Sequence, residues 1–234
     1  MRIDVITAFP EYFRGPFNES MIKQAHQRVG LNLNLWDLRD FTHDVHRTVD
    51  DTPYGGGAGM VLKPEPFFEA LEYLFAHQIQ RQETVIIYPS PQGKILNNEV
   101  VKTLAQQNNL VFLCGHYKGI DQRVIDYWVD EEISIGDYVL TGGELATIVM
   151  IDALIRWIPG VVGDMDSVKS DSFEAYLLDA PYYTRPAKYR GLTVPSVLLS
   201  GNHKAIEHWR FEQKVTRTKQ KRPDLYEKFL EKNT

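Results

Sequence analysis

Three glycine-containing segments are the parts of this chain best suited to hold a ligand. Residues 88–93, 114–119 and 134–143 each follow or end a hydrophobic run typical of a β-strand. Glycine adopts positive φ at little cost and lets a ligand approach the backbone closely. In open α/β sheets, ligands bind where the strands end. We therefore expect the three loops to surround one compact ligand with main-chain groups, although any one loop taken alone is compatible with an ordinary turn.

A fourth glycine cluster, residues 53–60, follows the two carboxylates Asp50 and Asp51. It contains neither GxxxxGK[ST] nor a GxGxxG that opens a helix, so it matches no common phosphate-binding fingerprint. The missing P-loop lysine disfavours a phosphoryl transferase, which is the second hypothesis for the function. A donor-rich substrate loop and a plain hairpin both remain open.

Alternating strand and helix patterns are expected to position these loops. Strands are predicted at residues 3–8, 31–38, 84–88, 110–114 and 133–140. Helices are predicted at residues 64–75, 97–105, 121–128 and 144–157, the last of them stopped by Pro159 and Gly160. This alternation indicates an α/β fold with a mostly parallel sheet covered on both faces.

The character of the sequence changes after Gly160. Residues 161–172 are polar and rich in Gly, Asp and Ser, which indicates a linker. An irregular segment at 179–195 precedes two predicted helices, one after Asn202 and one after Pro223. From residue 201 to the end there are nine Lys or Arg and five Asp or Glu, a net charge of +4, within a chain of net charge −5. Such a basic segment fits a phosphate backbone as partner, or simply a solvated helix face.

Composition also bears on the compartment. The single cysteine, Cys114, rules out an internal disulfide and makes a cysteine-based zinc site very improbable. Neither an export signal nor a run of eighteen apolar residues is visible. We expect a cytoplasmic protein with no membrane span.

Several blocks of the chain resemble the bacterial tRNA (guanine-37-N1)-methyltransferases, the TrmD family of the SPOUT superfamily, over nearly the whole length. In order along the chain, the blocks are Arg39-Asp40-Phe41-Thr42, His46 to Asp51, Gly55 to Gly59, Ser90-Pro91-Gln92-Gly93, Ile135 to Glu144, Asp171-Ser172, Tyr183 to Pro186 and Leu192 to Pro195. So many blocks in one order make a chance match very improbable.

The resemblance implies a fold that no sequence pattern reveals, a SPOUT-type sheet with a deep trefoil knot where the ligand loops thread through one another. It implies a knotted cofactor-binding domain at residues 1–160, a linker at 161–176 and a small helical tRNA-binding domain at 177–234. A homodimer is expected, with tRNA as substrate.

The resemblance also implies S-adenosylmethionine as cofactor, held in the knot by the three loops. The residues expected to contact it are Tyr88, Ser90, Pro91, Gly115, Tyr117, Ile135, Gly136, Asp137, Tyr138, Val139, Leu140, Gly142 and Gly143. The family depends on magnesium as well. No carboxylate cluster in the sequence defines a magnesium site, and no metal ligand is named.

Guanine N1 carries a proton at neutral pH, so a general base is needed before it can attack a methyl group. The resemblance assigns this role to Asp171, contributed by the partner subunit, and assigns stabilisation of the developing charge on O6 to Arg156. Asp50, Gly55, Gly59 and Ser172 are expected to bind the substrate. From position alone, Asp171 is compatible with a solvated linker residue, and Arg156 with a residue that complements a helix dipole.

Some residues depart from the family pattern. Many members have Arg, Glu, Glu and Pro where this chain has His116, Lys118, Gln122 and Ala58. Lys118 reverses a charge beside the expected cofactor, so any side-chain contact of the family's Glu to the methionine portion is not expected here, whereas contacts by the Gly115 backbone are. A third hypothesis, an RNA-binding module without catalysis, requires only the basic C-terminal helices and neither Asp171 nor Arg156.

Overall fold

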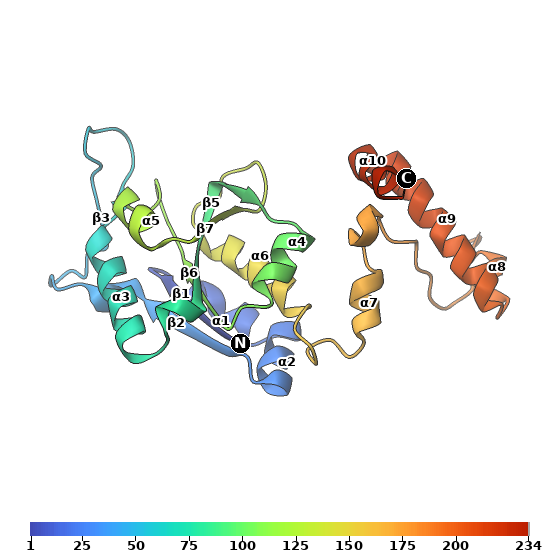
Figure 1. Ribbon diagram of the computed structural model, residues 1–234, viewed down its shortest axis with the longest axis horizontal. Helices are drawn as coiled ribbons and strands as arrows, with labels where there is room; N and C mark the ends of the chain where they lie inside the picture. Colours follow the sequence, from blue (N-terminus) through green and yellow to red (C-terminus); the bar gives the residue numbers. More distant parts are fainter. Residues whose placement is uncertain (234) are drawn as a thin grey trace. The chain divides into compact units, whose positions relative to one another are not determined.

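The computed structural model describes residues 1–233. They form two compact units, residues 1–163 and 164–233. The boundary falls within the segment expected to be a linker. Each unit is described separately below, and both are drawn in Figure 1.

A five-stranded parallel sheet forms the centre of the first unit, in the order β2-β1-β6-β5-β7 (Figure 1). Its strands are β1 (Arg2–Thr7), β2 (Asn32–Asp37), β5 (Thr84–Ile95), β6 (Asn109–Leu113) and β7 (Glu131–Ser134). The expected α/β class with a mostly parallel sheet is therefore confirmed. A separate two-stranded pair, β3 (Asp50–Asp51) with β4 (Val61–Leu62), is antiparallel.

Helices cover both faces of this sheet. The unit contains α1 (Glu11–Phe17), α2 (Ser20–Val29), α3 (Pro64–His77), α4 (Asn98–Leu104), α5 (Gln122–Trp128) and α6 (Glu144–Ile155), with the 3₁₀ turns η1 (Leu38–Phe41) and η2 (Arg81–Glu83). Residues with a known preference for helix N-termini determine where several of these helices begin. Pro64 opens α3, and the side chain of Asn97 accepts hydrogen bonds from the N–H groups of Glu99 and Val100 at the start of α4.

Alternate residues of β6 supply two separate hydrophobic cores. Leu110 and Phe112 pack with α1, α2, α4 and α6 on one face, while Val111 and Leu113 pack with α3 and α5 on the other. All four side chains are fully buried. Because a strand buried on both faces carries apolar residues without a break, its sequence is a continuous hydrophobic run.

Two predicted strands have different bounds from those expected. The strand predicted at 133–140 was wrong in extent, because β7 ends at Ser134, whose hydroxyl exchanges hydrogen bonds with the N–H and C=O of Gly136 and turns the chain away. Conversely, β5 continues beyond the expected end at Tyr88, and its register against β7 shifts between Pro89 and Lys94. Helices α1 and α2 were not expected.

The second unit is mostly helical. It comprises α7 (Met165–Ser170), η3 (Glu174–Tyr176), the antiparallel pair β8 (Lys188–Tyr189) and β9 (Leu192–Thr193), α8 (Ser196–Leu199), α9 (His203–Lys221) and α10 (Pro223–Lys232). Helix α7 lies in the segment expected to be a linker. Asn202 caps α9 by accepting from Ala205 N–H at 3.2 Å, at the start of the helix predicted after Asn202. In residues 1–233, no helix is both long enough and apolar enough to span a bilayer.

Candidate cofactor pocket and catalytic residues

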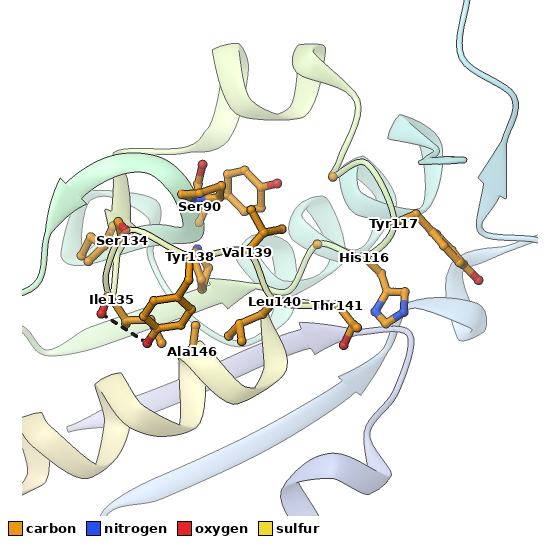
Figure 2. A pocket seen from close by; sticks show the side chains of 18 of the residues that line it. Ser90, His116, Tyr117, Ser134, Ile135, Tyr138, Val139, Leu140, Thr141 and Ala146 are labelled. Carbon is orange, nitrogen blue, oxygen red and sulfur yellow. Dashed lines mark hydrogen bonds between the residues drawn. The ribbon is translucent and has the colours of Figure 1, made fainter. Parts of the chain in front are cut away.

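The irregular middle of β5, where the register against β7 shifts, and the loops after β6 and β7 meet at one edge of the sheet and enclose a pocket (Figure 2). Main-chain hydrogen bonds join them: Gly143 N–H donates to Gly115 C=O at 2.8 Å, and Leu96 N–H donates to Ser134 C=O at 2.8 Å. About 650 Å³ of space lies between the loops, counting the open mouth. That space suits a ligand the size of a nucleoside with a short side chain.

All the residues expected to contact the cofactor line this pocket except Asp137, which is exposed and does not line it. The other lining residues, Pro89, His116, Lys118, Gly119, Ile133, Ser134, Thr141 and Ala146, were not among the expected contacts, although all but Ile133 and Ala146 lie in the three predicted loops. Most of them are neighbours of expected residues within the same loops. Ala146 carries no such signal, because it reaches the pocket from the first turn of α6.

The Tyr88 side chain requires glycine at two positions of the pocket wall. A Cβ at Gly115 or at Gly119 would lie 3.0 or 2.9 Å from the Tyr88 hydroxyl oxygen. Burial raises the pKa of the Tyr88 hydroxyl, which stays neutral at physiological pH. The ring therefore forms a fixed, uncharged part of the wall.

The loop after β7 presents main-chain groups and apolar side chains to the pocket. Figure 2 shows Ile135, Tyr138, Leu140 and Ala146 on one side of the opening and His116 on the other. The Tyr138 ring lies over Gly136, where a Cβ would come within 2.6 Å of a ring carbon. Its hydroxyl donates to Ile135 C=O at 3.4 Å. This wall suits an aromatic base that pairs with backbone donors and acceptors.

A buried carboxylate lies beneath the loop at the start of α6. Glu144 is 2% exposed and accepts a hydrogen bond from Thr7 Oγ1 at 2.8 Å. His116 Nδ1 lies 3.8 Å from the other carboxylate oxygen, and the imidazole packs against Phe9. A Cβ at Gly142 would lie 2.2 Å from the Glu144 carboxylate. The side chains of Glu144 and His116 therefore occupy the space beside Gly142 and require a glycine there.

Asp50 and the glycine cluster form a projecting hairpin in the first unit (Figure 1). Asp50 pairs with Leu62 at the base of the hairpin. Gly55 and Gly59 have φ of +83° and +99°, values that L side chains rarely adopt. No atom lies within 4 Å of a Cβ built at Gly55. The tip of the loop is thus open to solvent.

Arg156 is the C-terminal cap of α6 and is exposed. Helix α6 is mostly apolar and carries no separate polar face, and its Leu145 and Val149 are 48% and 47% exposed. Residues 145, 149 and 156 are four and seven positions apart, so they share one face of the helix. The exposed face of α6 thus carries an apolar stripe of Leu145 and Val149, followed on the same face by the exposed Asp152 and Arg156.

Asp171 ends α7 in the second unit and is partly buried. One of its carboxylate oxygens accepts from the N–H of Ser172 at 2.8 Å, and the Ser172 hydroxyl accepts from Asp179 N–H at 3.0 Å. Lys214 of α9 donates to Ser170 C=O at 2.6 Å and pairs with Asp179 at 3.0 Å. Contacts from two other segments therefore fix the chain on either side of Asp171.

The basic residues of α9 divide into two groups. Lys214 is held in the contacts above, and Lys219 lies over the Tyr226 ring at 5.8 Å. Lys204, Arg210 and Lys221 are exposed, and no carboxylate within 4.0 Å pairs with them in the described part of the chain. Within residues 1–233, no group of three or more His, Cys, Asp or Glu side chains could hold a metal ion.

Comparisons with known proteins identify the family of the chain. The model of the family described as tRNA (Guanine-1)-methyltransferase TrmD matches residues 1–228. Two relatives named tRNA (guanine-N(1)-)-methyltransferase, from Dehalococcoides mccartyi strain ATCC BAA-2266 and from Protochlamydia amoebophila, are each 51% identical. The matches cover 97% and 96% of this chain and 91% and 99% of those proteins. A third, from Anoxybacillus flavithermus, is 47% identical over 98% of this chain and 93% of its own length. The chain therefore belongs to the TrmD family of tRNA (guanine-1)-methyltransferases.

Proposed function

We propose that the chain transfers a methyl group from S-adenosylmethionine to N1 of guanine at position 37 of cytoplasmic tRNA. The observation that carries the proposal is the pocket enclosed by the middle of β5 and the loops after β6 and β7, in a chain whose family members act on guanine N1 of tRNA. Family membership favours this function over a phosphoryl transferase or an RNA-binding module without catalysis.

The pocket fits the proposed cofactor. Backbone groups of residues 135–143 suit the edge of adenine, and the side chains of Ile135, Tyr138 and Leu140 suit its faces. Close contacts among the three loops, including the bridge between His116 and Gly142, are consistent with the trefoil knot, which belongs to this proposal. When bound, the cofactor supplies an activated methyl group on a sulfonium.

The chain's own part in the reaction is to remove a proton and to stabilise charge. Asp171 takes the proton from guanine N1, and the Ser172 N–H holds one oxygen of that carboxylate in place. As the proton leaves, negative charge develops on O6, and the guanidinium of Arg156 stabilises it. Asp50, Gly55, Gly59 and Ser172 would hold the guanosine and its neighbours. The magnesium requirement stays a prediction, and no ligand is assigned.

A homodimer completes the site in this proposal. A second copy would cover the apolar stripe of Leu145 and Val149, whose exposure in a single chain is costly. Arg156 lies on the same face of α6, so the proposed interface brings it to the boundary between subunits. Asp171 of the partner subunit would then meet Arg156 across that boundary.

The first test replaces the proposed base. Asp171→Ala should abolish the transfer of labelled methyl to tRNA, with S-adenosylmethionine affinity within about twofold of the wild type, because the carboxylate acts on guanine and lies outside the pocket lining. The matched control is Asp166→Ala, an exposed carboxylate on the same helix. Unchanged turnover in Asp171→Ala would remove Asp171 from its role.

A second test addresses the dimer. Mixing Asp171→Ala chains with Arg156→Ala chains should restore roughly a quarter of the wild-type activity. Half of randomly mixed dimers are heterodimers, and each contains one intact composite site. Activity is measured after the two chains are refolded together. No recovery would indicate a site built within one subunit.

A further inference from the structure

Lys118 connects the cofactor pocket with the glycine hairpin at residues 53–60, which is proposed above to bind the substrate. It lines the cofactor pocket, and its backbone N–H donates to Met60 C=O at 3.0 Å. Leu62 N–H donates to Gly119 C=O, and Asp121 N–H donates to Leu62 C=O, each at 3.0 Å. The second pocket loop is therefore hydrogen-bonded to the base of the glycine hairpin.

The side chain of Lys118 also contacts the glycine hairpin. Its Cγ and Cε lie 3.0 and 3.2 Å from where a Cβ at Gly59 would be. Gly59 thus leaves room for the aliphatic stem, which lies along the backbone there. This contact restricts the directions that the stem of this pocket-lining residue can take.

The ammonium of Lys118 has no carboxylate partner within 4.0 Å among residues 1–233. The nearest acidic residue along the chain, Asp121, is engaged by Arg123 through two hydrogen bonds of 2.8 Å. That pairing lowers the pKa of the Asp121 carboxyl, with the hydrogen bonds from Arg123 as the main cause. The Asp121 carboxylate therefore pairs with Arg123 and not with Lys118.

The pocket contains no acidic side chain among its lining residues, and Lys118 is its one permanent cation in the described structure. An exposed cation at the mouth of such a pocket attracts an anionic group of the bound molecule. If the adenine lies against residues 135–140, the amino-acid end of the cofactor reaches the opposite wall, where His116 and Tyr117 lie in Figure 2. The carboxylate is the anion at that end.

We propose that Lys118 binds the amino-acid carboxylate of S-adenosylmethionine and so determines how the chain recognises the methionine portion. The inference rests on the proposed function. An acidic side chain at this position could pair only with the ammonium of the same portion. The lysine therefore changes which of the two groups is recognised, while the main-chain contacts to the rest of the cofactor stay the same.

Calorimetric titration with two ligands tests this assignment. Lys118→Met keeps the stem and removes the charge, so its affinity for S-adenosylmethionine should fall about tenfold, the value of an exposed charge-assisted hydrogen bond. Decarboxylated S-adenosylmethionine lacks the anion and should bind the wild type and Lys118→Met equally. Lys118→Arg should retain most of the affinity. Lys23→Met, an exposed lysine on α2, is the matched control and should behave as the wild type.

Other outcomes would overturn the inference. An equal loss for both ligands would assign Lys118 to packing on Gly59. Unchanged cofactor affinity with a raised KM for tRNA would assign its charge to an RNA phosphate. A wild-type protein that binds neither ligand would refute the proposed function itself, a result distinct from either of these.

Discussion

At the scale of single residues, the first residue of α6, Glu144, has a buried carboxylate, and burial is costly for a charged group. Glu144 lies beneath the pocket floor, 2% exposed, and Thr7 Oγ1 is the neutral donor that satisfies it. The N-terminus of α6 adds favourable partial charge. An unsatisfied carboxylate in such a place costs more than an ordinary lost hydrogen bond. The pocket floor therefore depends on a threonine of β1 that lies 137 residues away in the sequence.

Replacing that donor should destabilise the first unit. Thr7→Val preserves the shape of the fully buried side chain and leaves Glu144 without its hydroxyl partner. We expect the free energy of unfolding to fall by roughly 1–3 kcal/mol, measured by urea denaturation. Thr103→Val is the control, since the Thr103 hydroxyl bonds to a backbone carbonyl on the exposed side of α4. Equal stability of both variants would contradict this account of Glu144.

The residue types predicted much of the pocket, because a glycine that follows a hydrophobic run indicates a loop at the end of a strand, and this pattern depends only on neighbouring residues. The long-range contacts gave no such signal. Lys118 lies along Gly59, and the Tyr88 hydroxyl occupies the space beside Gly119, but neither contact follows from spacing along the chain. Positive φ at Phe173, Ala175 and Tyr176 is also invisible in the sequence, since these residue types do not favour it.

At the scale of elements, the sequence predicted strands and helices better than their ends. The apolar residues 138–140 extended the predicted last strand, but Gly136, at φ +145°, lets the chain leave the sheet after Ser134. Prolines 89 and 91 hid the continuation of β5, which resumes pairing with β7 at Lys94. Polar composition hid α7, whose Asp164 cap accepts from Asp166 N–H at 2.8 Å.

The contact between α9 and the end of α7 gives an element-scale prediction. Lys214→Met removes the ammonium that holds Ser170 C=O and Asp179, so the segment carrying Asp171 should lose its fixed geometry. We expect kcat to fall roughly tenfold, the scale of a modest misplacement of the base, with S-adenosylmethionine affinity unchanged.

Lys221→Met controls for lost charge on α9, because Lys221 is exposed near the C-terminal end of the same helix. If α9 acts only as a basic surface for RNA, both variants should raise KM for tRNA to the same extent and leave kcat alone. That pattern would refute the positioning role of Lys214.

At the scale of the whole molecule, two compact units divide the proposed chemistry. The pocket-lining residues and Arg156 belong to residues 1–163, while Asp171 and the basic helices belong to the second unit. The charge asymmetry of the sequence indicated such a division. Composition located the boundary only to within the polar segment after Gly160, because that segment contains both the end of one unit and the first helix of the next.

The single cysteine allows the stability of the first unit to be followed alone. Cys114 is 1% exposed at the end of β6, and burial, with the nearby charge of Glu144, raises its pKa well above the ordinary value. Its thiol should react with iodoacetamide only when the first unit opens.

S-adenosylmethionine at about 100 times its Kd should stabilise that unit by about 2.7 kcal/mol and slow alkylation about 100-fold. Amide exchange in α9 should change far less, because every pocket-lining residue lies in the first unit. Equal protection of α9 would show that the cofactor couples the two units even without tRNA, and unchanged alkylation would place cofactor binding outside this pocket.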